Sequence, residues 1–429
     1  MVSLPDDRFV SPLAAELADD VLERFLRYVQ IDTQSAYGQP GTPSTAKQLD
    51  LSRVLEAELR ELGLDNVRLD EFGYVYGSLP GTEGTPAVGL IAHVDTSPDV
   101  TGTNVKPQVH RAYDGTRIVL SGDESQILDP EEQPALGQKI GHDLVTTDGT
   151  TLLGADDKAG VAEIVAAVAY LKRNPKPGHA PIRVCFTVDE EIGAGADHLD
   201  LDDFGAAYAY TLDGSGLGEI ETETFNAWKV IVTVHGRAVH PGSAKGKLVS
   251  AIRLAADFVA ALPRDRLSPE TTEGREGFIH PSGITGTGEK TVVELIVRDH
   301  DRAKLDEHLA VIHRTAEEIG AREPRARLEV TEEETYRNMR EVIDQHPIVV
   351  EKAEEAVRRA GAEPVHAIIR GGTDGARLSA RGLPTPNLFT GGQEYHSLRE
   401  WASVQDMAAA AATVVELARV WAEPGPLES

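Results

Sequence analysis

Acidic and imidazole side chains, which can bind metal ions or move protons, follow five apolar runs of the sequence. They occur in the segments His93–Asp95, Gly154–Gly160, Asp189–Gly193, Thr211–Gly216 and Gly391–His396. Residues two apart in a strand point to the same side, so His93 and Asp95 would project together, and a carboxylate beside a histidine orients its ring. Adjacent acids such as Asp156 and Asp157 can instead cap a helix, and a lone histidine is more often structural. Each of these signals is ambiguous when taken alone. The interpretation of a shared centre therefore rests on the combination of two histidines with four carboxylates.

A set of this composition could bind two divalent ions. Zinc accepts imidazole and carboxylate ligands at roughly 2.0–2.2 Å, and two ions roughly 3.5–4 Å apart share one bridging carboxylate. Each ion would take one histidine and one further carboxylate, which leaves one of Glu190 and Glu191 free to accept a proton from a metal-activated water. The only cysteine, Cys185, excludes a zinc site built on several thiolates.

The overall composition excludes other classes of function. The 429 residues include 42 basic and 70 acidic side chains, for a formal net charge of −28. Binding nucleic acid requires a basic field around the phosphates, so nucleic acid is excluded as a partner. The sequence contains no apolar stretch long enough for a membrane span and no signal-peptide pattern, so we expect a cytoplasmic protein with no membrane partner.

The elements that must position these residues alternate along the first half of the chain. Helical periodicity covers 13–30 and 45–62, apolar runs at 87–92 and 182–188 predict buried strands, and 159–171 predicts an Ala- and Val-rich helix. This alternation is typical of an α/β domain with a largely parallel sheet flanked by helices, in which ligands gather at the carboxyl ends of the strands.

The pattern changes after about residue 224 and returns at about residue 338. Strand-like alternation at 228–236 and 291–298, with helical stretches at 247–261 and 302–319, predicts an inserted α+β domain of one sheet and two helices. The predicted boundaries are 1–224 for the first part of the catalytic domain, 225–337 for the inserted domain, and 338–429 for the second part of the catalytic domain.

Six stretches between residues 91 and 396 carry the motifs of a known family. They read IAHVDTSPDV, TTDGTTLLGADDKAGVAEI, DEEIGAGA, GRAVHPGSAKGKLV, RGGTDGARLS and NLFTGGQEYH. In this order they resemble the peptidase T family of tripeptide aminopeptidases, in the superfamily of two-zinc peptidases and aminoacylases. The resemblance implies an enzyme that releases the N-terminal residue of tripeptides with two zinc ions per subunit, for which cobalt or manganese could substitute.

The resemblance also implies the role of individual residues. Asp156 would bridge the two ions, His93 and Asp213 would complete one site, and Glu191 and His396 would complete the other. Glu190 would be the general base, and Asp95 would orient the ligand histidine two residues before it. The peptide bond that follows Asp156 would be cis.

The inserted domain would then be a lid and the surface through which a homodimer forms. His240 resembles a lid histidine that reaches the partner's active site and polarises the scissile carbonyl, although a histidine before proline can simply cap a turn. Arg370 resembles a clamp for the substrate carboxylate, a task that suits the planar fork of arginine. Arg298 could be a second carboxylate contact or an ion-pair partner of Asp299 or Asp301.

Other interpretations of the same residues stay open. A dipeptidase or an N-acyl amino-acid deacylase could use the same two metals, and a non-catalytic metal-binding assembly protein is a more remote alternative. The segment 397–401 also departs from the family pattern, which often has glycine and basic residues there. We expect this departure to leave metal coordination intact and to affect side-chain preference.

Overall fold

The computed structural model describes residues 7–423, which divide into two compact units. Unit 1 is formed by the described residues of Met1–Thr222, Glu341–Ala367 and Thr373–Ser429, and unit 2 by Glu223–Arg340 and Ile368–Gly372. Arg370 therefore belongs to unit 2, to which the chain returns for a second, short segment. No helix among the described residues is long and apolar enough to cross a membrane.

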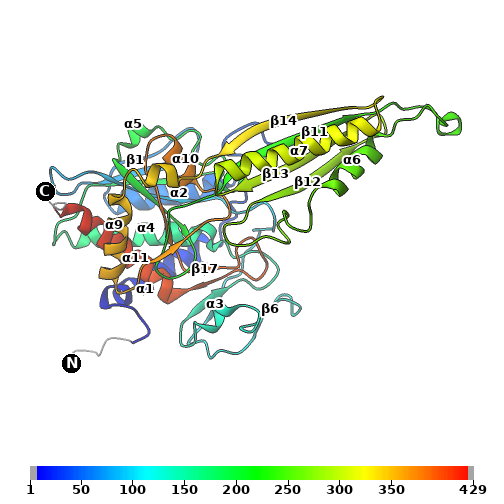
Figure 1. The fold of residues 1–429 in the computed structure, drawn as a ribbon. Coiled ribbons are helices and arrows are strands. Elements are labelled where there is room, and N and C mark those ends of the chain that lie inside the picture. Colours follow the sequence, from blue (N-terminus) through cyan, green and yellow to red (C-terminus); the bar gives the residue numbers. More distant parts are fainter. Residues whose placement is uncertain (1–6, 424–429) are drawn as a thin grey trace. The chain divides into compact units, whose positions relative to one another are not determined.

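An eight-stranded mixed sheet forms the centre of unit 1 (Figure 1). In spatial order its strands are β1 (Asp65–Leu69), β2 (Val75–Leu79), β8 (Ile182–Thr187), β3 (Val88–His93), β9 (Tyr208–Gly214), β16 (Asn387–Phe389), β10 (Glu219–Glu221) and β15 (Val365–Ala367). Strand β3 is parallel to both β8 and β9, and β9 is parallel to β16. The carboxyl ends of these strands therefore meet at one edge of the sheet, where ligands are expected.

Helices cover both faces of this sheet, which confirms the predicted α/β class. They are α1 (Pro12–Tyr28), α2 (Gln48–Glu61), α4 (Ala155–Arg173), α5 (Leu201–Phe204), α9 (Ile348–Ala360), α10 (Asp374–Ala380) and α11 (Val404–Ala422), with the single turns η1 (Glu190–Ile192) and α8 (Arg340–Ile343). On one face Tyr210, paired with Leu90, accepts a hydrogen bond from Trp421 of α11. Gly89, the residue before Leu90, lies on the other face, because successive strand residues point to opposite faces. There Phe204 of α5 covers it.

A second, smaller sheet in unit 1 supports the loop that carries His396. Its strands in spatial order are β17 (Gly392–Gln393), β18 (Trp401–Ser403), β7 (Leu144–Thr146) and β4 (Gln108–His110), and the hairpin β5 (Ile118–Val119) and β6 (Ile127–Leu128) and the turn α3 (Pro134–Gly137) lie in the same part of the chain. Trp401 is fully buried and belongs to a local core that includes Leu120 and Leu136. Because β17 and β18 pair antiparallel, they hold both ends of the loop between them.

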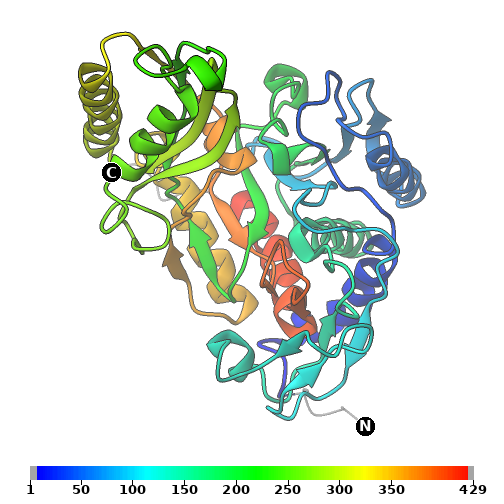
Figure 2. The ribbon, with the colours of Figure 1, turned by 90° about the vertical axis from the view of Figure 1, so that its right-hand side faces the viewer.

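Unit 2 is one antiparallel sheet with two helices, as expected from the sequence (Figures 1 and 2). In spatial order the strands are β12 (Phe278–Gly286), β13 (Lys290–Asp299), β11 (Asn226–His235) and β14 (Arg327–Tyr336), and the helices are α6 (Ala251–Ala261) and α7 (Arg302–Arg322), with the turn η2 (Pro241–Ser243). The helices contact each other and both contact β13, so they cover one face. Val230, Val232 and Val234 of β11 point into the core beneath them, which explains the alternation in the sequence. Helix α6 begins at Ala251 rather than 247, because Ser250 caps it.

Candidate active site

The predicted metal ligands and the predicted base Glu190 lie at the ends of neighbouring strands or in loops beside them. His93 is the last residue of β3, Asp213 lies at the end of β9, and the turn η1 with Glu190 and Glu191 follows β8. Asp156 lies at the start of α4, and His396 lies in the loop between β17 and β18. The peptide bond between Asp156 and Asp157 is cis, as the family resemblance implies.

One half of the site, which we call the enclosed half, consists of His93, Asp156 and Asp213. His93 Nε2 lies 2.9 Å from Asp156 Oδ1 and 3.7 Å from Asp213 Oδ1. The other ring nitrogen, Nδ1, lies 3.0 Å from the carbonyl oxygen of Asp95 and 3.4 Å from its carboxylate Oδ1, so both edges of the ring are held. Only 2% of the His93 side chain is exposed.

The other half, the open half, consists of Asp156, Glu191 and His396. His396 Nε2 lies 3.1 Å from Asp156 Oδ2 and 2.8 Å from Glu191 Oε2. The His396 side chain is 40% exposed, and its Nδ1 lies 3.7 Å from Asp99 Oδ2. Asp156 therefore turns one carboxylate oxygen to each histidine, and in each half the potential ligand atoms lie within 4.8 Å of one another.

The charge balance of the site favours bound cations. Burial and the neighbouring Asp156 carboxylate raise the pKa of Glu191 to about 8 and that of Asp213 to about 6. Burial lowers the pKa of His396, but the carboxylates of Asp156 and Glu191 outweigh this effect and raise it to about 11. Glu191 Oε1 is also buried without a hydrogen-bond partner among the described residues. Divalent ions fit such a concentration of carboxylates, because buried charges require partners or metals.

Asp95 and Asp157 hold the backbone around the ligands. The two carboxylate oxygens of Asp95 accept hydrogen bonds from the backbone N–H groups of Glu190 at 3.0 Å and Glu191 at 3.2 Å. Asp157 Oδ2 accepts from the N–H of His93 at 3.1 Å, and its Oδ1 accepts from Gly160 at 3.2 Å, as a residue at a helix start can. Asp95 thus contacts the acidic turn as well as the histidine.

Sequence reasoning missed Asp189 as a supporting residue. Asp189 is buried and has a left-handed φ of 61°. Its carboxylate accepts hydrogen bonds from the backbone and hydroxyl groups of Ser44 at 2.6 and 2.5 Å and from Gln48 at 2.6 Å. The acidic run at 189–191 drew attention to this residue, but the partners are about 140 positions away, and no local pattern indicates them.

Asp374 is a second buried carboxylate that the sequence reasoning did not use. It lies at the start of α10 and accepts a hydrogen bond from the hydroxyl of Thr187 at 2.8 Å. Burial raises its pKa to about 7, with smaller effects from His93, Asp95 and Asp213. Its position in the stretch RGGTDGARLS was the only available signal.

Unit 2 contains the other three predicted site residues. His240 is exposed, and its Nδ1 accepts a hydrogen bond from the backbone N–H of Gly242 at 3.1 Å, so it caps η2. The guanidinium of Arg370 donates to the carbonyls of Gly274 at 2.7 Å and Glu276 at 2.8 Å, and it lies over the ring of Phe225. Its Nη2 donates to the carbonyl and the hydroxyl of Thr272, so both terminal nitrogens are hydrogen-bonded within unit 2.

Arg298 occupies an aromatic environment. Its guanidinium lies 5.9 Å from the ring centres of both Phe278 and Tyr336, and Nη1 donates to the carbonyl of Arg370 at 3.3 Å. Arg298 Nε is buried without a hydrogen-bond partner among the described residues. Asp299, which the sequence suggested as an ion-pair partner of Arg298, lies 2.9 Å from His308 Nε2.

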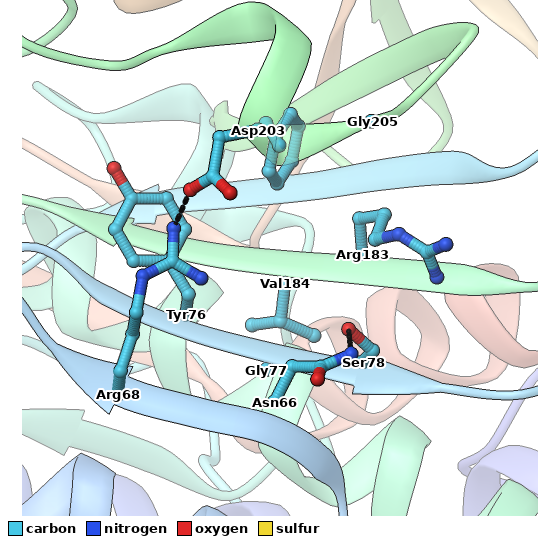
Figure 3. A pocket seen from close by; sticks show the side chains of 10 residues that line it. Asn66, Arg68, Tyr76, Gly77, Ser78, Arg183, Val184, Asp203 and Gly205 are labelled. Carbon is cyan, nitrogen blue, oxygen red and sulfur yellow. Dashed lines mark hydrogen bonds and ion pairs between the residues drawn. The ribbon is translucent and has the colours of Figure 1, made fainter.

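A separate pocket lies elsewhere in unit 1, between β1, β2, β8 and the α5 region, and has a volume of about 320 Å³ (Figure 3). Arg68 lies over the ring of Tyr76 at 3.9 Å and pairs with Asp203. Arg183 lies at the opposite side of the pocket from Arg68. None of the predicted site residues lines it. The pocket is therefore not the predicted metal centre.

Comparison with known proteins agrees with the fold and the motifs. The model of peptidase family M20/M25/M40 matches residues 143–420, and the chain belongs to this family of metallo-exopeptidases. Relatives named Peptidase T are 49% identical in Desulfitobacterium hafniense and 47% identical in an Exiguobacterium species, each over 94% of this chain and 98% of the relative. The resemblance to the peptidase T family is thereby confirmed.

Solved structures give the same result. The aminopeptidase PepT of Bacillus cereus has a TM-score of 0.71 at 26% identity and covers 95% of this chain and 99% of its own. A tripeptidase of Staphylococcus aureus has a TM-score of 0.72 at 25% identity and covers 94% of this chain and 98% of its own. The YXEP protein of Bacillus subtilis, described as a dinuclear metal-binding peptidase of the M20 family, shares the fold with a TM-score of 0.62 at 15% identity.

Proposed function

We propose that the chain is a zinc-dependent aminopeptidase that hydrolyses the N-terminal residue from tripeptides. The observation that carries this proposal is the placement of Asp156 between two histidines, with Oδ1 2.9 Å from His93 Nε2 and Oδ2 3.1 Å from His396 Nε2. A carboxylate that serves two imidazoles is the arrangement expected of a ligand shared by two ions. The relatives named Peptidase T and the solved tripeptidase support the choice of substrate.

The proposed ligands are His93 and Asp213 for one ion, Glu191 and His396 for the other, and Asp156 for both. Imidazole and carboxylate donors suit zinc, and cobalt or manganese would be accepted by the same set. The unpartnered Oε1 of Glu191 supports this assignment. When bound, the two ions would polarise the scissile carbonyl and lower the pKa of the attacking water.

Glu190 is the proposed general base. A carboxylate oxygen of Glu190 would accept a proton from the attacking water and later donate it to the leaving amine. Burial raises the pKa of Glu190, which suits a group that must take up a proton. The hydrogen bond from its backbone N–H to Asp95 supports a fixed position for the side chain.

Unit 2 is proposed as the lid and dimerisation domain, on the strength of the family resemblance. His240 would reach the active site of the partner subunit and polarise the scissile carbonyl. Arg298 and Arg370 would contact the substrate carboxylate, and the unbonded Nε of Arg298 supports its part in this. Arg370 would exchange its contacts with the 272–276 backbone for the carboxylate.

Substrate choice separates the proposal from its alternatives. We expect metal-replete enzyme to prefer a tripeptide over a dipeptide and over an N-acetyl amino acid, with no cleavage of a tripeptide whose N-terminus is blocked. Preference for the dipeptide would indicate a dipeptidase, and preference for the N-acetyl amino acid a deacylase. Cleavage of none of the three compounds would favour the non-catalytic assembly protein, and the proposal would then be wrong.

We also propose a cytoplasmic location, which the single buried cysteine supports.

A mixing experiment tests the proposed role of the dimer. Dimers of His240→Ala and dimers of Glu190→Gln should both have low activity, and subunit exchange between them should restore part of it. The reason is that one of the two sites in a mixed dimer would combine an intact Glu190 with the partner's His240. Exchange without recovery would exclude a site shared between subunits.

A further inference from the structure

Glu400 joins the two loops that carry Asp156 and His396. It lies between His396 and β18, and only 1% of it is exposed. Its Oε2 accepts hydrogen bonds from the backbone N–H groups of Leu153 at 2.7 Å and Gly154 at 2.8 Å, and its Oε1 accepts from that of Asp156 at 3.1 Å. One buried carboxylate therefore serves three backbone donors, the last of which belongs to the residue between the two halves of the site.

The backbone N–H groups of Leu153, Gly154 and Asp156 donate no hydrogen bond within a helix or a strand. Gly154 has a φ of 84°, and Asp156, with φ −83° and ψ 104°, is not helical although it lies at the start of α4. The backbone at 153–156 therefore departs from the helix, and its N–H groups need acceptors from elsewhere because buried N–H groups are rarely left unpaired. Glu400 supplies these acceptors.

The other end of the connection is also fixed. Trp401, the residue after Glu400, is fully buried and pairs with Thr146 of β7, which holds Glu400 at the start of β18. Tyr395, the residue before His396, donates a hydrogen bond from its hydroxyl to the carbonyl of Gly214 at 2.9 Å. The loop that presents His396 is thus held at both sides, and Glu400 ties it to the backbone of Asp156.

We propose that Glu400 is a positioning residue that sets the separation between Asp156 and His396 and thereby assembles the open half of the site. The inference rests on the proposed function, in which both residues are metal ligands. Outer partners that orient ligands typically change metal affinity or activity by about 10–100-fold when they are removed. Segment 397–401, expected from the sequence to affect side-chain preference, would have this second role.

The Glu400→Gln variant tests the proposal with little change in volume. Glutamine retains one oxygen acceptor, and its NH2 group would face at least one backbone N–H as a second donor. If the oxygen keeps Leu153 and Gly154, the contact with Asp156 is lost. We expect Glu400→Gln to bind the zinc ion of the open half about 10–100-fold more weakly, while the zinc ion of the enclosed half binds as in wild type.

The measurement is a zinc titration of metal-free protein by calorimetry, together with kcat and KM for a tripeptide. At limiting zinc, kcat should fall with little change in KM, and excess zinc should restore most of it. Glu400→Asp keeps the charge but is one methylene shorter, so it should have an intermediate zinc affinity. Glu163→Gln is the matched control, because Glu163 is fully buried in α4 of the same unit and bonds none of these loops.

The outcomes distinguish the inference from the proposed function. If wild type binds two ions and Glu400→Gln binds both equally well with unchanged kcat, the inference is wrong and the proposed function stands. A lower unfolding temperature with unchanged zinc affinity would make Glu400 merely structural and would also overturn the inference. If wild type itself binds fewer than two ions, the proposed two-ion function fails and the inference fails with it. Should Glu400→Gln not fold, the same criteria apply to Glu400→Asp.

Discussion

The two halves of the candidate site contain the same kinds of side chain but are built differently. In the enclosed half, His93 ends a central strand, is 2% exposed, and has both ring nitrogens within 3.0 Å of an oxygen atom. In the open half, His396 comes from a loop and is 40% exposed, and its Nδ1 lies 3.7 Å from the exposed carboxylate of Asp99. The sheet therefore fixes one half, whereas the other depends on contacts between loops.

This difference has a consequence for metal binding. A ring whose second nitrogen is held by an oxygen is oriented before a metal arrives, and that orientation raises metal affinity. We therefore expect the enclosed half to bind its ion more tightly and to exchange it more slowly. The open half should depend on the residues that connect its loops.

The largest effect is expected from Asp156→Ala, because Asp156 is the only residue common to both halves. Its removal should abolish detectable tripeptide hydrolysis and reduce zinc binding in both halves. Zinc content after dialysis, measured beside activity, is the appropriate readout. Retention of two tightly bound ions by a folded variant would show that the halves do not share this ligand.

Glu190→Gln should affect the chemistry and leave both halves intact. Loss of a general base typically lowers the rate by about 10²–10⁴-fold, and we expect kcat to fall by this amount. The variant should still bind two zinc ions, because Glu190 is not among the proposed ligands. A wild-type kcat would remove Glu190 as the base, and loss of an ion would make it a ligand.

His93→Ala and His396→Ala compare the halves directly. Each should weaken zinc binding by more than the roughly 10–100-fold that is typical of outer partners. Added imidazole should restore part of the activity of His396→Ala, because this side chain is partly exposed, and should do little for the enclosed His93→Ala. Equal rescue of both variants would contradict the distinction between enclosed and open halves.

The smallest effect concerns the rate at which a chelator removes the ions. We expect two phases in wild type, with the more exposed ion lost first, and no fast phase in His396→Ala. Stopped-flow detection of released zinc would resolve the phases. Loss of both ions in a single phase from wild type would indicate that the two halves are equally accessible.

Part of this site could be predicted from the sequence because it follows from strand position. His93, Asp213 and the pair Glu190 and Glu191 each follow an apolar run, and parallel strands bring their carboxyl ends to one edge. The Ala- and Val-rich composition that predicted helix 159–171 reflects a helix that is buried all round, since every residue from 159 to 169 is buried. Regular elements and the residues at their ends were therefore predictable.

The supporting contacts were not predictable, because they join distant loops. Glu400 contacts a backbone segment about 245 residues earlier, and Asp189 contacts Gln48, which lies 141 residues earlier. No periodicity encodes such pairs. The environment of Arg298, between two aromatic rings and beside the carbonyl of Arg370, likewise depends on three separate segments of unit 2. A single sequence left its two interpretations open for this reason.

Anomalous X-ray diffraction from zinc-loaded crystals, at the zinc absorption edge, would show whether Asp156 lies between two bound ions. We expect two peaks on either side of the Asp156 carboxylate, one beside His93 and Asp213 and the other beside Glu191 and His396. A single peak, or two peaks that Asp156 does not share, would contradict this expectation.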